Sequence, residues 1–237
     1  FQPAPQFVTA TSNASFFVRV GGSSPFAYQW QFGTTDIPNA TNQSFDILGA
    51  LTANAGNYRV IITNAAGSIT SSVAALTVNV PPSITAHPLS QTANAGTAVS
   101  FSVGIDPSST TPLAYQWNFN DVAMPGKTNA TLDLANVKAD AEGKYSVTIA
   151  NVAGTVTSLA ATLTVITPPS INAQTANQTA ISGSLVSFFV DVAGTTPLAY
   201  QWFFNGRAIA GAVNPSLDLS GIQATNAGRY SVTITNA

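Results

Sequence analysis

The sequence predicts an all-β protein of three tandem β-sandwich domains. One octapeptide recurs three times, as PFAYQWQF at 25–32, PLAYQWNF at 112–119 and PLAYQWFF at 197–204. Short alternating apolar and polar segments, broken by Gly, Pro and Asn, are typical of half-buried strands, and no window keeps a helical period. Many short strands separated by turns favour a sandwich. The repeat predicts domains at 1–80, 81–167 and 168–237.

The elements of each repeat follow in a constant order. An apolar strand comes first, at 14–20, 99–105 and 186–192. The octapeptide is the next strand, entered through a proline turn, and its tryptophan points to the core. An alternating segment then has an aspartate at its centre, which indicates a solvated face or a turn contact and not a carboxylate pair for catalysis. A Gly-x-Tyr strand comes next, at 56–58, 143–145 and 228–230.

This order of strands resembles an immunoglobulin-like domain, close to the intermediate-set type of bacterial surface proteins. In such domains the tryptophan packs on a disulfide between the sheets, and the tyrosine forms a corner two residues before the second cysteine. The resemblance implies a structural core of the tryptophans Trp30, Trp117 and Trp202, the tyrosines Tyr58, Tyr145 and Tyr230, and the cysteine-position residues Val18, Val60, Val103, Val147, Val190 and Val232.

Two features depart from that family. The chain has no cysteine, and the lost crosslink costs about 4 kcal/mol in the entropy model, which burial of two valines offsets by about 3 kcal/mol. The residue four before the tyrosine is often aspartate in the family, but here it is Asn54, Ala141 or Asn226. We therefore expect a weakened or displaced corner hydrogen bond, above all in the middle repeat.

The joints and the end of the third repeat also carry information. Between the repeats the chain reads LTVNVPPSI at 76–84 and LTVITPPSI at 163–171. Proline pairs hold extended geometry, so we expect short, stiff joints and an extended rod of roughly 100–120 Å. The third repeat has no counterpart of 67–78 or 154–165. We expect it to lack its last strand, either because the chain is a piece of a longer protein or because another subunit supplies the strand.

Composition argues against most chemistry. Only 7% of the residues are charged and the net charge is −2, so no footprint for nucleic acid is expected. No apolar stretch is long enough for membrane insertion. The one histidine, His87, precedes a proline, and the Asp140 and Glu142 carboxylates have no repeated oxygen cage around them. We expect no catalytic residues, no metal and no cofactor.

Surface positions leave alternatives open. Phe17, Phe189 and Phe203 follow or interrupt inward residues and are expected to face outward; they are covered by neighbours, form a contact between chains, or form a sugar-stacking platform, and a contact is favoured over sugar. Glycosylation sequons begin at Asn13, Asn39, Asn42, Asn129 and Asn177, and in a chain this rich in Asn, Ser and Thr most are expected to be unmodified chance matches.

The sequence thus favours a non-enzymatic structural or adhesive repeat segment of a secreted or cell-surface bacterial protein. Such a segment acts as a spacer, stalk or extracellular fibre subunit, and its partners are proteins, through self-association or neighbouring repeats. The alternative is an accessory carbohydrate-binding module of a larger polysaccharide-degrading enzyme, with a surface glycan as its partner.

Overall fold

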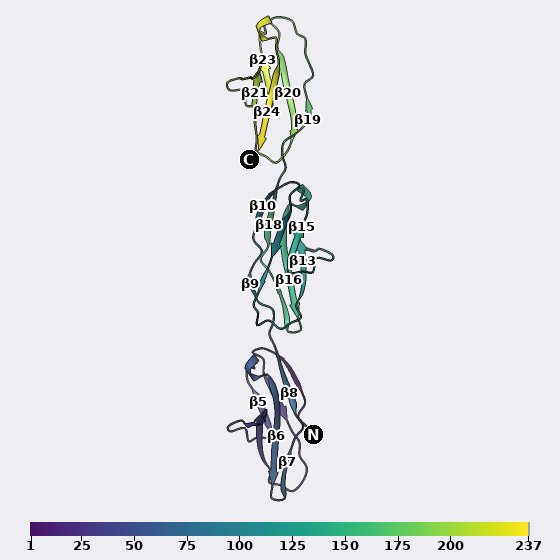
Figure 1. The fold of residues 1–237 in the computed structure, drawn as a ribbon, viewed down its shortest axis with the longest axis vertical. Coiled ribbons are helices and arrows are strands. Elements are labelled where there is room, and N and C mark those ends of the chain that lie inside the picture. The colour runs from purple at the N-terminus through teal and green to yellow at the C-terminus, as the bar shows by residue number, and fades with distance from the viewer. Residues whose placement is uncertain (237) are drawn as a thin grey trace. The chain divides into compact units, whose positions relative to one another are not determined.

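The computed structural model describes residues 1–236 and confirms an all-β chain of tandem sandwiches (Figure 1). Strands make up nearly all of its regular structure. Within the described residues the helical elements are three single 3₁₀ turns, η1 (Thr52–Asn54), η2 (Ala139–Ala141) and η3 (Ala224–Asn226). Each of these turns lies just before the strand that carries the corner tyrosine.

The first repeat has one large sheet and one small one. The large sheet has the order β1-β8-β6-β3-β4, with β7 beside β6, and the small sheet pairs β2 with β5. Its strands are β1 (Gln6–Thr9), β2 (Ala14–Phe17), β3 (Ala27–Phe32), β4 (Thr35–Asp36), β5 (Ser44–Ile47), β6 (Gly56–Asn64), β7 (Gly67–Thr70) and β8 (Ala74–Asn79). Strand β8 is central to this arrangement, because it runs parallel to β1 and antiparallel to β6.

The second repeat copies this topology. Its large sheet has the order β10-β18-β16-β13-β14, with β17 beside β16, while β11 pairs β15 and β12 pairs β9. Its strands are β9 (Ile84–Ala86), β10 (Gln91–Asn94), β11 (Val99–Ser102), β12 (Gly104–Ile105), β13 (Ala114–Phe119), β14 (Val122–Ala123), β15 (Thr131–Leu134), β16 (Gly143–Asn151), β17 (Gly154–Thr157) and β18 (Ala161–Ile166). Strand β18 takes the place of β8.

The third repeat lacks that closing strand in the part of the chain that the structure describes. It has two three-stranded sheets, β22-β21-β24 and β19-β20-β23. Its strands are β19 (Ser170–Gln174), β20 (Val186–Ala193), β21 (Leu198–Phe204), β22 (Arg207–Ala208), β23 (Ser216–Leu219) and β24 (Tyr230–Asn236). Strand β24 corresponds to β6 and β16 but pairs only with β21 among residues 1–236, as the sequence predicted.

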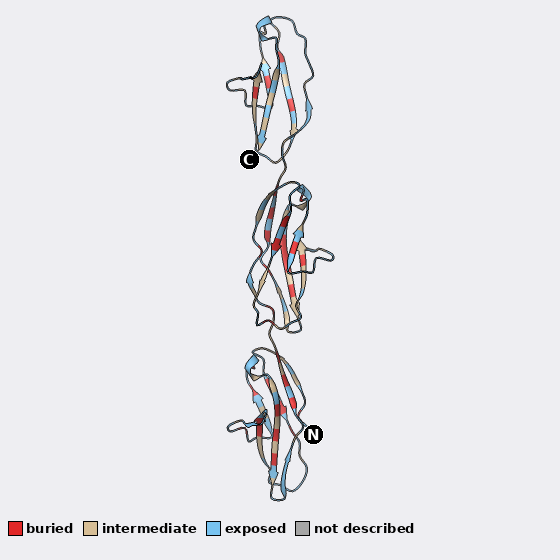
Figure 2. Ribbon diagram, viewed as in Figure 1, coloured by how far each residue is buried: buried red, intermediate tan, exposed pale blue. Residues whose placement is uncertain are grey.

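An aromatic cluster forms the centre of each repeat. The three tryptophans are at most 4% exposed, and Figure 2 shows the buried residues along the central strands. The apolar strand supplies one ring that stacks on the corner tyrosine, since the paired ring centroids lie 4.7 to 5.0 Å apart. These stacked pairs are Phe16–Tyr58, Phe101–Tyr145 and Phe188–Tyr230. Offset stacking adds to the stabilisation that burial provides.

The valines at the cysteine positions differ in burial. Val18, Val60, Val147 and Val190 are buried. Val103 is half-buried and lies in the gap between β11 and β12, where the chain changes pairing partner. Val232 is half-buried because it lies on β24, beside the position where the first two repeats have their closing strand.

The polar atoms of the octapeptide bond to backbone. Each indole N–H donates to a carbonyl twelve residues later, at 2.9 Å. The acceptors are the carbonyls of Asn42, Asn129 and Asn214. The glutamine before each tryptophan donates to the tryptophan's own carbonyl and to a carbonyl in the following turn, at 2.7 to 2.9 Å. Burial of the indole therefore leaves no donor unpaired.

The expected weakening of the corner in the middle repeat is wrong. Each tyrosine hydroxyl donates to the backbone carbonyl four residues earlier, at 2.7 to 2.8 Å, so the side chain there does not matter. The asparagine side chains have another role: Asn54 accepts from the Leu51 amide and Asn226 from the Gln223 amide, both at 2.8 Å. Ala141 has no side-chain oxygen for this cap of the 3₁₀ turn.

Candidate interaction sites

The residue before each Pro-Pro pair is held by the repeat that follows it. The Val80 amide donates to Thr110 Oγ1 at 2.8 Å, and the Val80 carbonyl accepts from the Thr110 amide at 3.0 Å and from Asn151 Nδ2 at 2.7 Å. Both polar groups of this linker residue are thus bonded to one repeat. We call this set of contacts the linker seat.

The second joint repeats the linker seat. The Thr167 amide donates to Thr195 Oγ1 at 2.7 Å. Its carbonyl accepts from the Thr195 amide at 3.0 Å and from Asn236 Nδ2 at 2.7 Å. Recurrence in the sequence points to the asparagine, because each copy has one 34 positions after its tryptophan. The hydrogen-bonding role of that asparagine was not predicted.

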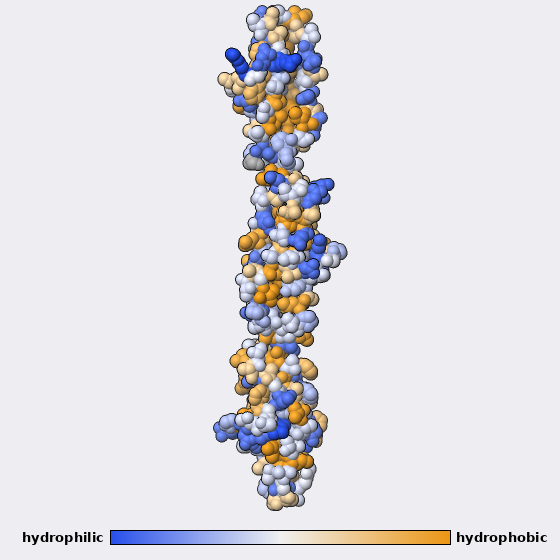
Figure 3. All heavy atoms as spheres, in the orientation of Figure 1, coloured by the Kyte–Doolittle hydropathy of each residue, from blue (hydrophilic) through white to orange (hydrophobic). Residues whose placement is uncertain are grey.

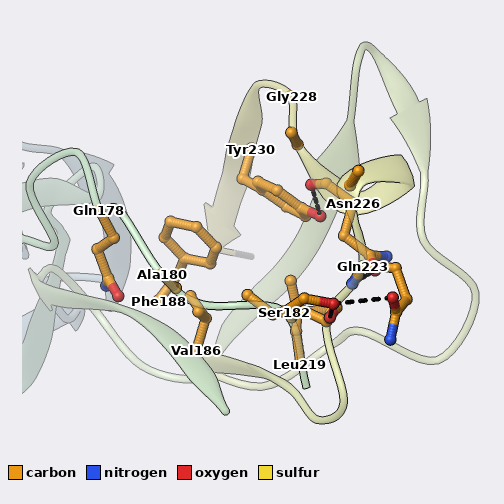
Figure 4. Close-up of a pocket in the computed structure, with 13 residues that line it drawn as sticks. Gln178, Ala180, Ser182, Val186, Phe188, Leu219, Gln223, Asn226, Gly228 and Tyr230 are labelled. Atoms are coloured by element: carbon orange, nitrogen blue, oxygen red, sulfur yellow. Dashed lines mark hydrogen bonds between the residues drawn. The ribbon is translucent and has the colours of Figure 1, made fainter. Parts of the chain in front are cut away.

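A groove opens along the free side of β24 in the third repeat. A cavity of about 400 Å³ has Ala180, Ser182, Phe188 and Tyr230 in its wall (Figure 4). A second, of about 990 Å³, reaches Trp202 and shares Phe188 and Tyr230 with the first, so the two form one continuous groove. The rim is polar: Ser182 Oγ donates to Gln223 Oε1 at 2.9 Å, as Figure 4 shows.

The groove exposes side chains that the other repeats bury. Tyr230 and Phe188 are half-buried, whereas their counterparts in the first repeat, Tyr58 and Phe16, are at most 3% exposed. Burial raises the pKa of the Tyr230 hydroxyl above its ordinary value. The same effect raises the pKa of Tyr58 and of Tyr145. The third core is therefore assembled but not covered.

The predicted contact phenylalanines differ in exposure. Phe17 is 38% exposed and Phe189 is 50% exposed. The ring of Phe1 lies 6.3 Å from that of Phe17, and Arg19 Cζ lies 5.9 Å from the same ring, so neighbours cover Phe17 in part. Phe203 is half-buried. Phe189 lines the groove. The face in Figure 3 otherwise intersperses apolar and polar residues.

The other predicted positions lie on the surface. All five sequon asparagines are exposed. The recurrent aspartates accept a hydrogen bond from a serine on the neighbouring strand. These pairs are Ser15–Asp46, Ser100–Asp133 and Ser187–Asp218. The aspartates thus form polar contacts between strands.

Sites for chemistry were searched over the described part of the chain. Residues 1–236 contain no group of three or more His, Asp or Glu side chains that could hold a metal ion. His87 Nδ1 accepts from the Leu159 amide at 3.1 Å, which ties the start of the second repeat to the segment before β18. No helix within residues 1–236 is long and apolar enough to cross a membrane.

Comparison with known proteins supports the geometry. The family model described as "Immunoglobulin domain" matches residues 81–151 and 168–236. Among solved structures, an I-band fragment of titin superposes with a TM-score of 0.80 at 18% identity, covering 99% of this chain and 92% of that one. A complex of Dpr2 with DIP-Theta gives a TM-score of 0.62 at 16% identity, covering 100% of this chain and 94% of that one. Both likenesses show the fold.

Curated relatives are much longer proteins. Endoglucanase C of Cellulomonas fimi is 28% identical over 177 residues, which is 71% of this chain and 16% of that protein. "Leucine-rich repeats and immunoglobulin-like domains protein 1" of Homo sapiens is 26% identical over 246 residues, which is 90% of this chain and 22% of that protein. The chain spans less than a quarter of the length of either relative.

Proposed function

Because this chain belongs to the immunoglobulin domain family, we propose that it is a non-enzymatic structural or adhesive segment of a secreted or cell-surface bacterial protein. It acts as a spacer or stalk that holds other parts of that protein apart. Its partners are proteins, through its own neighbouring repeats or through copies of itself. The domain boundaries of this proposal are 1–80, 81–167 and 168–237.

The observation that carries the proposal is the repeated linker seat. A flexible connection leaves its backbone groups to water, whereas Val80 and Thr167 each have both backbone groups bonded to the next repeat. The proline that follows each of them has a restricted backbone and no amide hydrogen to donate. A stiff joint of this kind is useful where separation is the function. The sparse charge and the Ser-, Thr- and Asn-rich surface support an extracellular location.

The joint can be tested with a matched pair of variants. Asn151→Ala removes the amide that bonds the Val80 carbonyl. Asn64→Ala removes the equivalent asparagine of the first repeat, which donates to the Ser23 carbonyl at 2.9 Å. Small-angle scattering is expected to show a broader distribution of particle dimensions for Asn151→Ala and an unchanged one for Asn64→Ala. Identical distributions for both variants and the wild type would refute the role of the seat.

The similarity to Endoglucanase C favours a second candidate, an accessory carbohydrate-binding module. Phe17 and Phe189 are the exposed rings that it would use. The spacer proposal expects no saturable binding in a pull-down on insoluble polysaccharide. Saturable binding that the double variant Phe17→Ser, Phe189→Ser abolishes would establish the module instead. Binding that survives both substitutions would place a glycan site elsewhere and would also count against a pure spacer.

A further inference from the structure

We propose that the groove of the third repeat is a strand-acceptor site, and that its occupant is an extended peptide with the alternation of β18, Ala-x-Leu-x-Val. The proposal does not rest on the spacer function. It rests on a comparison of the third repeat with the first two, where the same position is filled by β8 or β18.

Both edges that such a strand needs are in place. In the second repeat, β18 pairs in parallel with Gln91–Asn94 and antiparallel with Gly143–Tyr145. The equivalent edges of the third repeat are 178–181 and 228–230, and residues of both segments line the groove. An added strand would therefore bond to backbone on two sides, as in β-augmentation.

The first of these edges already has the geometry of its counterpart. Gln178 Nε2 donates to the Ser187 carbonyl at 2.7 Å, as Gln91 Nε2 donates to the Ser100 carbonyl at 2.7 Å. The segment ends in the same way, since the Gly183 amide donates to the Ile222 carbonyl at 2.7 Å. A preformed edge lowers the ordering cost of binding.

The side chains of the occupant follow from the register. In the second repeat, Ala161 lies opposite Tyr145, and Leu163 lies opposite both Gly143 and Gln91. Ala161, Leu163 and Val165 are at most 2% exposed, whereas Thr162 and Thr164 point outward. The occupant accordingly needs a small, a large and a branched apolar side chain at alternate positions. The first lies opposite Tyr230 and the second opposite Gly228.

The segment before the strand adds two polar contacts. Ser158 Oγ accepts from the Val147 amide at 3.0 Å, and the Ser158 amide donates to the Val147 carbonyl at 2.9 Å. Val232 is the equivalent of Val147 in the third repeat. An occupant with serine three residues before its alanine would make the same pair of bonds to Val232. The peptide with the sequence of residues 157–166, TSLAATLTVI, combines all of these features.

Cysteine crosslinking tests the register in the full chain, which has no native cysteine. Thr92 pairs with Thr164 between β10 and β18, and Thr179 is the equivalent of Thr92. We expect the Thr179→Cys variant to form a disulfide, in a glutathione redox buffer, with the peptide that carries Cys in place of Thr164. The Thr92→Cys variant is the matched control, because its neighbouring strand is already present. Its yield is expected to be several-fold lower.

A second measurement does not depend on cysteine. A fluorescently labelled peptide of residues 157–166 is expected to gain anisotropy on the unmodified chain and to raise the unfolding temperature of the third repeat. The same peptide with Leu163→Asp is expected to lose binding, because it would bury an unpaired carboxylate.

Three outcomes would overturn the proposal. One is equal crosslinking of the Thr179→Cys and Thr92→Cys variants. Another is equal binding of the Leu163→Asp peptide. The third is a stable dimer of the chain that the peptide does not dissociate, because the occupant would then be a second copy.

Discussion

At the scale of single residues, the stability of each repeat depends on how its aromatic rings meet small neighbours. Gly56 begins β6 with φ +153°, and a Cβ built on it would lie 2.6 Å from Phe32 Cε2. The Phe32 ring in turn packs on Tyr58, with 5.1 Å between the ring centroids. The glycine of the Gly-x-Tyr motif is therefore required both by its backbone and by the ring that covers it.

Gly56→Ala is expected to destabilise the first repeat by about 2 kcal/mol or more, from backbone strain plus displacement of the Phe32 ring. Gly67→Ala separates these two causes. Its φ of +148° is nearly the same, but a Cβ there meets nothing within 4 Å. Urea denaturation should show a smaller loss for Gly67→Ala. Equal losses would mean that the contact with Phe32 contributes nothing.

The corner tyrosines predict a loss of stability at alkaline pH. Burial raises the pKa of Tyr145 above its ordinary value of 10.0, and Asp140 raises it further. The unfolded chain therefore loses the phenolic proton first. The stabilisation is fully present below about pH 10 and disappears as the pH rises beyond it. The free energy of unfolding, measured from pH 8 to 11, should fall less steeply for Tyr145→Phe than for the wild type. Parallel curves would contradict this assignment.

At the scale of elements, the closing strand decides how well a repeat is protected. Strands β6 and β16 have a neighbour on each side, whereas β24 has β21 alone among the described residues. Ile149 on β16 is fully buried, while the corresponding Ile234 on β24 is half-buried. An edge strand beside an open groove has fewer apolar contacts to hold it closed.

Hydrogen exchange is therefore expected to be faster in β24 than in β16. The comparison is direct, because the two strands occupy the same position and have related sequences, GKYSVTIAN and YSVTITN. Mass spectrometry of peptides covering 143–151 and 230–236 measures it. Addition of the 157–166 peptide should slow exchange in β24 alone. Equal protection of both strands in the peptide-free chain would show that the groove does not weaken the third repeat.

At the scale of the whole molecule, each repeat has its own aromatic core. Trp30 and Trp202 are members of separate core clusters. Proteins built in this way have stabilities that are approximately sums of repeat terms and of terms between neighbours. A defect in one core should therefore remain mostly local.

Trp117→Ala tests that expectation. The substitution removes a fully buried ring and leaves the Asn129 carbonyl without its donor, so it should destabilise the middle repeat by about 3–5 kcal/mol. Calorimetry should show one transition moved to lower temperature while the others stay near their wild-type positions. Loss of all transitions together would mean that the repeats unfold as one unit.

Much of this protein follows from the sequence by itself. Period-two alternation and the triplicated YQW strand determined the β class, the number of repeats and the inward direction of Trp30, Trp117 and Trp202, because these depend on local geometry and on burial of apolar surface. The missing closing strand was also predictable, since its sequence is absent from the third copy. The exposure of Phe17 and Phe189 followed from the same alternation.

Only the tertiary structure decided which polar groups meet. Asn151 and Val80 lie 71 positions apart, and the amide that joins them depends on how the chain turns between β16 and β17. The same holds for the corner tyrosine, where the acceptor is a backbone carbonyl and not the expected side chain. Hydrogen bonds need atoms within a few tenths of an ångström of their ideal distance, and a pattern of residue types does not determine positions that closely.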